Sequence, residues 1–180
     1  MTKLNRLSPV DDHGRLRAVL ESPKGSRHKL KYEPATRIFT VACTLPAGMS
    51  MPFDFGFFPG TKGADDDPLD VLVLMDGPAF PGVVVPLRLL GVIQATQSDD
   101  GGKPSRNDRL IAVAEGSTER GDLHRIGDLD DGLLTQIEAW FETYGRLNGK
   151  QFRPIARRGV RGARRLLEQS TLRRDQTLSA

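Results

Sequence analysis

The sequence predicts a mainly β protein of the α+β class, a closed or nearly closed antiparallel barrel with helices against its side. Two observations lead to this prediction. Short segments with β-branched or alternating residues, separated by Pro and Gly, fill the first two thirds of the 180-residue chain. A single strong apolar stripe at helical spacing follows at residues 133–147. Many short strands before one long helix are typical of such a barrel.

Six segments are expected as strands, three before residue 46 and three after residue 70. Residues 46–64 are rich in Pro, Gly, Met and Phe, and we expect an ordered loop there that packs its rings inward. The polar, Gly-containing stretch at 97–108 is expected as a hairpin loop. The expected strands are Leu16–Glu21, Leu30–Glu33, Arg37–Leu45, Val71–Met75, Val83–Gln94 and Arg109–Ala114.

Helices are expected late in the chain. Three acids at 128–131 precede the apolar stripe and are explained better as helix-start chemistry than as a metal site. Asn148-Gly149 is expected to end this helix. A shorter helix is expected over 160–172, with a frayed end after it. The sequence therefore predicts one domain over residues 1–175 with an Arg-rich C-terminal helix, and a disordered tail over 176–180.

Composition is ordinary for a globular protein, with 38% hydrophobic and 27% charged residues. No apolar stretch approaches the length of a membrane span, so no membrane association is expected. The single cysteine, Cys43, excludes an internal disulfide and fits a reducing compartment. We therefore expect a cytoplasmic protein.

The C-terminal segment is strongly basic, with eight arginines and one acid, Glu168, between Arg153 and Arg174. Such a segment could bind nucleic acid or another polyanion. It has no aromatic interleaving beyond Phe152 and no recognisable binding motif. A solvated helix is favoured, and nucleic acid is disfavoured as a partner.

Residues 65–70 carry four carboxylates in six positions, Asp65-Asp66-Asp67-Pro68-Leu69-Asp70, directly before the apolar run Val71–Met75. Acids crowded at the mouth of a buried strand repel one another and lose solvation, so a positive partner must offset that cost. Hard divalent cations such as Mg²⁺ bind carboxylate oxygens and retain waters for a phosphate substrate. A metal site is the sharper interpretation, and a solvated acidic turn is the alternative.

The run DDDPLDVLV resembles the signature of the family I soluble inorganic pyrophosphatases. The resemblance covers roughly residues 15–150. It implies a five-stranded, OB-like barrel with flanking helices. Other matching segments, in the family's order and spacing, are E-x-P at 21–23, LKYE at 30–33, MPFDFGFFPGT at 51–61, PG at 81–82, LGVI at 90–93, RLIAV at 109–113 and FETY at 141–144.

The resemblance implies hydrolysis of inorganic diphosphate to two phosphates by a metal-activated water. Mg²⁺ is the implied cofactor, with Mn²⁺ or Zn²⁺ as alternatives. Asp65 and Asp70 are the implied metal ligands, and Asp67 is an implied ligand and the acceptor of the water's proton. The further implied site residues are the acids Glu21 and Glu33 and the phosphate contacts Lys31 and Tyr144.

Without the resemblance, some of these residues have plainer interpretations. Lys31 and Glu33 are two apart on one expected strand and would form an ordinary polar face. Tyr144 belongs to the apolar helical stripe, so a core role with its hydroxyl at the rim is equally compatible.

The chain departs from the family pattern at several positions. Cys43 falls where the family carries an arginine on phosphate, and Gly145 where it carries a lysine. Met51 and Phe55 fall where it carries tyrosines. Each lost charge-assisted hydrogen bond to phosphate is worth about 1.5–3 kcal/mol, so the resemblance predicts weakened activity.

A second metal-binding cluster of the family is also altered. Gln97-Ser98 stands where the family has an Asp-Glu pair, and Asn107-Asp108-Arg109 where it has Asp-x-Lys. Asp99, Asp100 or Asp108 could replace the missing ligands, although a one-residue slip would point Asp108 to the opposite face. Arg109 could still supply charge, with a planar fork in place of an ammonium.

Two other functions stay open at this point. One is a hydrolase of another small phosphorylated substrate, because the replaced cations and tyrosines reshape the pocket. The other is a catalytically weak binding or regulatory protein on the same scaffold. The resemblance also implies a homo-oligomer.

Overall fold

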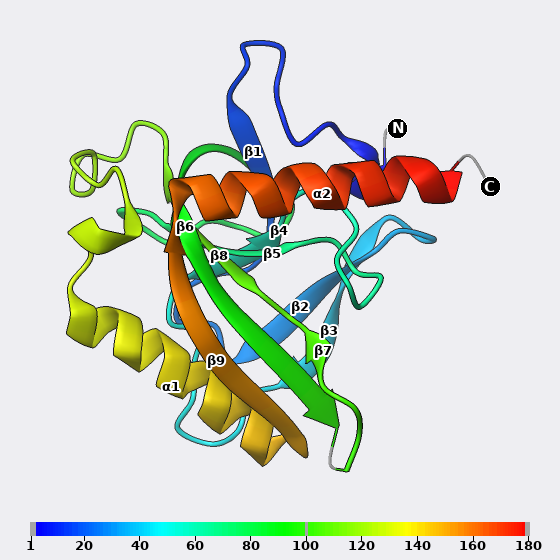
Figure 1. Cartoon of the computed structure of the whole chain (residues 1–180), viewed down its shortest axis with the longest axis vertical. Coiled ribbons are helices and arrows are strands. Elements are labelled where there is room, and N and C mark those ends of the chain that lie inside the picture. The colour runs from blue at the N-terminus through cyan, green and yellow to red at the C-terminus, as the bar shows by residue number, and fades with distance from the viewer. Residues whose placement is uncertain (1–2, 100, 179–180) are drawn as a thin grey trace.

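A closed ring of five strands forms the centre of this computed structural model (Figure 1). The structure describes residues 3–99 and 101–178, with side chains described through 171. The long strand β6 pairs back to the first strand of the ring and closes it. The predicted five-stranded barrel is therefore confirmed. Its strands, in ring order, are β1 (Leu16–Ser22), β4 (Asp54–Phe57), β5 (Asp70–Leu74), β8 (Arg109–Ala114) and β6 (Val84–Asp99).

One seam of the ring corrects the expected antiparallel arrangement. β5 and β8 run parallel, with Val71 opposite Leu110 and Leu74 opposite Val113. Parallel neighbours need a long connection between them, and here that connection contains β6, which pairs with β8 on its other edge. The first residues of β5 and β8 therefore lie at the same end of the barrel.

The predicted loop at 46–64 contains a strand that sequence analysis missed. β4 has four buried residues, and Gly56 allows it to approach β1 so closely that a Cβ would lie 2.0 Å from the Val19 carbonyl oxygen. The surrounding Pro and Gly residues gave a loop signal, although tertiary pairing decides the outcome. The expectation that the phenylalanine rings pack inward is confirmed for Phe53, Phe55, Phe57 and Phe58.

A second strand missed by sequence analysis is β9 (Lys150–Gly159), which pairs antiparallel along β6 from Gly91 to Asp99. Its sequence is polar and Arg-rich and contains Pro154, features that argue against a central strand. β9 pairs only with β6 among the described residues, so this proline removes no second ladder bond.

The hairpin at 97–108 is also more ordered than expected, because β6 extends to Asp99 and β7 spans Ser105–Arg106.

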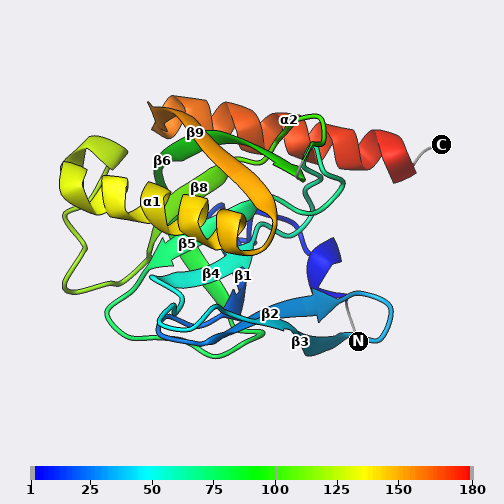
Figure 2. The same cartoon turned by 90° about the horizontal axis from the view of Figure 1, so that it is seen from below.

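A two-stranded sheet lies outside the ring. β2 (His28–Glu33) pairs with β3 (Ile38–Thr44), and Figure 2 shows this hairpin on one side of the barrel with the C-terminal helix on the other. Both strands confirm the sequence prediction, with β2 beginning two residues earlier than expected.

The helices largely follow the prediction. α1 (Asp131–Leu147) begins after Asp130, whose carboxylate accepts a hydrogen bond from Leu133 N, so the acids act as helix-start residues as expected. α2 (Val160–Leu178) is longer than the expected 160–172, because no Gly or Pro interrupts its last turns. Of the expected disordered tail, 176–178 continue α2 and 179–180 lie outside the described residues. The short 3₁₀ helices are η1 (Leu4–Arg6) and η2 (Ile126–Asp128).

Alternate residues of β5 join two apolar clusters. Leu72 and Leu74 pack in the cluster covered by α1, whereas Val71 and Val73 pack in the cluster reached by α2. By the same alternation, Asp70 belongs to the α1 side of the sheet. None of the described helices is long and apolar enough to cross a membrane.

Candidate functional site

A cavity of about 1030 Å³ opens between the acidic segment, the β2–β3 hairpin, the end of α1 and the β6–β7 turn. Polar side chains from distant parts of the sequence meet in this cavity. Of the candidate residues that the structure describes, it contains all except Asp108. The candidates that line it are Glu21, Lys31, Glu33, Asp65, Asp67, Asp70, Asp99, Arg109 and Tyr144.

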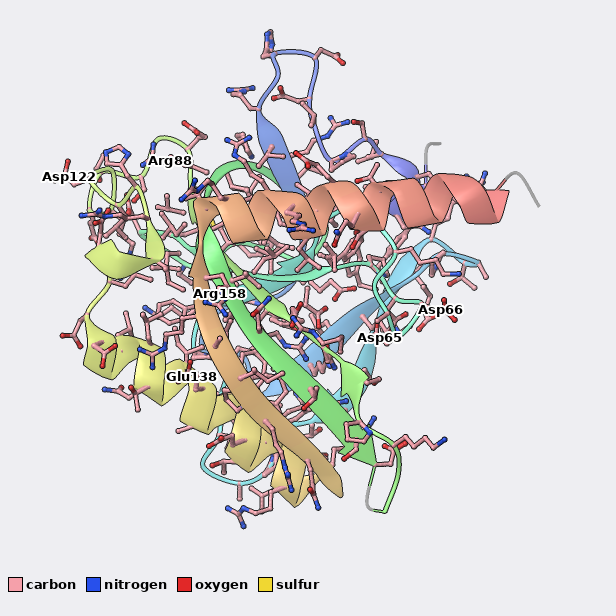
Figure 3. The ribbon with its side chains drawn as sticks, in the orientation of Figure 1. Asp65, Asp66, Arg88, Asp122, Glu138 and Arg158 are labelled. Carbon is pink, nitrogen blue, oxygen red and sulfur yellow. The ribbon has the colours of Figure 1, made fainter. Side chains whose placement is uncertain are left out.

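The acidic segment forms a tight turn before β5. Asp66 has a φ of 67°, and the Asp67 amide donates a hydrogen bond of 3.3 Å to Asp65 Oδ1. This turn directs Asp66 outward (Figure 3). The Asp66 side chain is 82% exposed, and its Oδ1 lies 2.8 Å from Lys62 Nζ. All four acids, Asp65, Asp66, Asp67 and Asp70, line the cavity, but Asp66 turns its carboxylate to Lys62.

The carboxylates of the cavity disfavour each other's charged forms. Burial of its cavity side, and then the charges of Asp70 and Asp67, raise the pKa of Asp65, although the residue as a whole is exposed. Burial raises the pKa of Glu21 to about 7, and the charge of Asp70 adds to this effect. Glu21 Oε1 accepts a hydrogen bond of 2.7 Å from Tyr32 N, which holds its carboxyl in place. The acids therefore form a site where added positive charge is stabilising.

Side-chain cations already pair with two of these acids. Lys31 Nζ lies 3.3 Å from Asp67 Oδ2, and Arg109 Nη1 lies 2.7 Å from Asp70 Oδ2. Partial burial lowers the pKa of Lys31, but the charge of Asp67 and hydrogen bonding to it outweigh this and raise it overall. Lys31 is therefore charged at neutral pH.

The donor set of the cavity fits a hard divalent cation. Among the side chains that the structure describes, in residues 3–99 and 101–171, no three carboxylate, thiol or imidazole groups converge as ligands on one point. Asp67 and Asp70 turn to Lys31 and Arg109 instead. The carboxylates that share the cavity still offer the oxygen ligands that Mg²⁺ prefers. Burial first, and then the charges of Asp70 and Asp67, raise the pKa of Asp65, so added positive charge would stabilise its ionised form. The residues present therefore fit a bound metal.

Arg109 is held rigidly at the floor of the site. Its side chain is 7% exposed, and its guanidinium lies 5.0 Å from the Phe141 ring centroid and 5.4 Å from that of Phe152. It also donates to the Asn107 side-chain oxygen. These contacts fix the guanidinium against Asp70 and leave little freedom for either group.

Tyr144 lies at the rim of the cavity with its ring stacked on Trp140, at 5.3 Å between centroids and an interplanar angle of 12°. Its hydroxyl lies 3.5 Å from Cys43 Sγ. Burial and the Cys43 contact raise the pKa of Tyr144, so the hydroxyl keeps its proton and can donate it in a hydrogen bond. The plainer interpretation of Tyr144, a ring in the apolar stripe with its hydroxyl at the rim, agrees with these contacts, whereas its contact with phosphate stays a prediction.

Asp108 is not brought to the cavity. It is buried, its Oδ1 accepts from Ala95 N at 2.9 Å, and its Oδ2 accepts from Arg106 Nη2 at 2.8 Å. Asp108 thus joins β6 to the β7 segment, and the one-residue offset from Arg109 turns it away from the acids.

Asp99 does line the cavity, but its side chain is 79% exposed and lies 3.6 Å from Lys150. Asp100 falls outside the described residues. Gln97, Ser98 and Asn107, which replace the family's acids, also line the cavity.

The four other departures from the family pattern lie in the same cavity. Met51 and Phe55 are each 3% exposed and belong to the cluster beneath α1. Gly145 is buried against β9, where a Cβ would lie 3.3 Å from Phe152 N. Cys43 contacts Tyr144 rather than replacing the charge of an arginine.

Sequence analysis missed four lysines that line the cavity: Lys29, Lys62, Lys103 and Lys150. Period-two alternation from Lys31 would have placed Lys29 on the same face of β2, had the strand been extended by two residues. Lys103 and Lys150 follow Gly-containing turns, and no periodic signal places them.

Comparison with known proteins gives one consistent family. The family model described as inorganic pyrophosphatase matches residues 18–174. A Thermus thermophilus protein named inorganic pyrophosphatase is 34% identical over 151 residues, covering 84% of this chain and 83% of that protein. A Halalkalibacterium halodurans protein of the same name is 32% identical over 154 residues, covering 86% and 91%.

Solved structures agree with the sequence comparisons. The Thermus thermophilus inorganic pyrophosphatase structure superposes with a TM-score of 0.87 at 30% identity, covering 97% of this chain and 99% of that chain. A Neisseria gonorrhoeae inorganic pyrophosphatase structure gives a TM-score of 0.84, also at 30% identity, covering 96% and 99%.

Proposed function

The chain belongs to the inorganic pyrophosphatase family, and we propose that it hydrolyses inorganic pyrophosphate to two phosphates in the cavity described above. One observation carries this proposal. Asp65, Asp67 and Asp70 share a single cavity with several side-chain cations, of which Lys31 pairs with Asp67 and Arg109 with Asp70. Diphosphate hydrolysis requires two kinds of group, carboxylates that bind a metal ion and cations that bind the phosphate oxygens.

We propose that Asp65, Asp67 and Asp70 would hold a divalent metal ion. The family implies dependence on a divalent metal, and we propose Mg²⁺ because the available ligands are carboxylate oxygens. Mn²⁺ and Zn²⁺ are the alternatives. When bound, such an ion lowers the pKa of water and neutralises charge on the phosphate oxygens.

Asp67 is the proposed proton acceptor for the attacking water. Its side chain is 59% exposed and its cationic partner is Lys31, with contacts of 3.3 and 3.4 Å that are long for a charge-assisted hydrogen bond. A phosphate group entering the cavity competes for the Lys31 ammonium. Transfer of Lys31 from Asp67 to phosphate frees the carboxylate oxygens of Asp67 to accept a proton.

The other chain residues position and neutralise the substrate. Arg109 holds Asp70 in place and supplies positive charge beside it. The Tyr144 hydroxyl is protonated and donates to a phosphate oxygen. Glu21 and Glu33 line the cavity as further acids. The replaced groups at Cys43, Met51, Phe55 and Gly145 still predict a slower reaction than their cationic and hydroxyl counterparts would give.

We further propose a cytoplasmic location, since the one cysteine is free. A homo-oligomer is proposed as well, which light scattering on the purified chain would test.

Phosphate release from the purified full-length chain tests the proposed activity. Pyrophosphate, triphosphate and a set of phosphate monoesters are compared in Mg²⁺, Mn²⁺ and Zn²⁺, with EDTA as the metal-free control. We expect pyrophosphate to be the preferred substrate and EDTA to abolish its turnover. A preference for a monoester, or no release from pyrophosphate with any of the three metals, would overturn the proposal.

A further inference from the structure

We propose that Lys29 is a phosphate-binding residue of this cavity, acting beside the Tyr144 hydroxyl. The inference rests on the proposed function for the identity of its anion, and no family position assigned above includes Lys29. It begins from a half-buried lysine that lines a cavity together with acids and other cations.

The ammonium of Lys29 is held by two aromatic rings. Its Nζ lies 5.9 Å from the Phe55 ring centroid and 5.8 Å from the Tyr144 ring centroid. Contacts of this length between an ammonium and a ring are attractive. They provide no hydrogen-bond acceptor with lone pairs, so the donors of the ammonium need another partner.

No carboxylate supplies that partner among the residues whose side chains the structure describes. Lys29 forms no salt bridge there, whereas Lys31 pairs with Asp67 and Lys62 with Asp66. Glu21 is close enough for the charge of Lys29 to lower its pKa against the effect of burial. A partly desolvated cation without an ion pair favours an anionic occupant in the cavity beside it.

The positive charge on this side of the cavity comes from β2, because the residue opposite Lys29 on β3 is a cysteine. Lys29 pairs across the hairpin with Cys43, whose Sγ lies 3.5 Å from the Tyr144 hydroxyl. Lys29, Cys43 and Tyr144 therefore form one wall of the cavity, and Lys29 supplies its positive charge. A protonated hydroxyl and an ammonium together match the acceptor oxygens of a phosphate group.

Binding of inorganic phosphate in the presence of Mg²⁺, measured by titration calorimetry, tests this assignment without requiring turnover. Lys29→Met should raise the dissociation constant for phosphate about tenfold to a hundredfold, because a charge-assisted hydrogen bond is lost. Lys29→Arg keeps the charge and should bind within a few-fold of the wild type. An unchanged constant in Lys29→Met would overturn the proposal, as would the absence of phosphate binding to the wild-type chain.

Lys24→Met is the matched control. Lys24 also lies over a phenylalanine, with its Nζ 5.8 Å from the Phe53 ring centroid, but it does not line the cavity. Its variant should bind phosphate as the wild type does. An equal loss in Lys24→Met and Lys29→Met would show a general charge effect and overturn the assignment.

A second-site variant separates phosphate binding from a structural role. Cys43→Arg in the Lys29→Met background returns a cation to the same wall from the opposite strand. We expect the double variant to recover at least part of the phosphate affinity that Lys29→Met loses. We also expect Lys29→Met to raise the KM for pyrophosphate and the double variant to lower it again. If Lys29→Met fails to fold, Lys29→Gln is used in the same comparison. Failure of pyrophosphate turnover in the wild type, with phosphate binding still dependent on Lys29, would reject the proposed activity and retain this subsite.

Discussion

Arg109 Nη1 lies 2.7 Å from Asp70 Oδ2, and this pair joins the first residues of the two parallel strands of the barrel. The pair therefore belongs both to the fold and to the candidate site. The guanidinium is nearly buried, whereas the Asp70 side chain is 27% exposed toward the cavity. Loss of the arginine would leave a carboxylate beside other acids without its cation.

Arg109→Met should lower the free energy of unfolding in EDTA by about 3 kcal/mol, the lower end of the cost of breaking a buried ion pair. The loss should be smaller in Mg²⁺, because a bound cation neutralises Asp70. Urea unfolding in the two buffers measures the difference. Arg125→Met, which breaks the exposed pair with Asp128, is the control and should change little in either buffer. Equal losses for Arg109→Met with and without Mg²⁺ would contradict a role for Asp70 in metal binding.

Glu21 predicts a pH dependence of stability. Its pKa is raised from 4.5 to about 7, so between these values the folded chain keeps a proton that the unfolded chain has lost. Stability in EDTA should therefore fall as pH rises through this window, by about 3 kcal/mol at most. Glu21→Gln keeps the oxygen that accepts from Tyr32 N and should remove this part of the slope. Unfolding between pH 4 and 8 measures it, with the exposed Glu115→Gln as control. A Glu21→Gln slope equal to that of the wild type would refute the buried-carboxyl account.

Tyr144→Phe isolates the role of one hydroxyl. The ring remains stacked on Trp140, so the free energy of unfolding should change by less than about 1 kcal/mol. The kcat/KM for pyrophosphate should fall about tenfold to a hundredfold, because a hydrogen bond to phosphate is lost. Cys43→Ala removes the sulfur that contacts this hydroxyl and should retain activity within a few-fold. If Tyr144→Phe kept full activity, the hydroxyl would have only a packing role.

The sequence predicted those parts of the fold that have a local signal. α1 has an apolar stripe and an Asp130 cap, and β5 has a continuous apolar run, so both were found with nearly correct ends. β9 carries four charged residues and a proline, and its identity as a strand depends on pairing with β6 more than 50 residues earlier. No local pattern contains that information.

The site residues also divide into those with a local sequence signal and those that only the fold brings together. Asp65, Asp67 and Asp70 lie in one short motif, which the sequence alone could single out. The side-chain pairs Lys31–Asp67 and Arg109–Asp70 join elements far apart in the chain and required the closed barrel. Asp108 differs from Arg109 by one position, and only the register of β6 with β8 decided which side chain reaches the acids.

Phosphate release from pyrophosphate in Mg²⁺, compared between the wild type, Asp67→Asn and Asp66→Asn, tests the central claim most directly. The two variants neutralise adjacent acids, and asparagine tolerates the positive φ at position 66. Asp66 turns outward to Lys62, so its variant should keep near wild-type activity. Loss of the proton acceptor in Asp67→Asn should lower kcat about a hundredfold or more. Equal activity of the two variants, or no phosphate release by the wild type, would contradict the account.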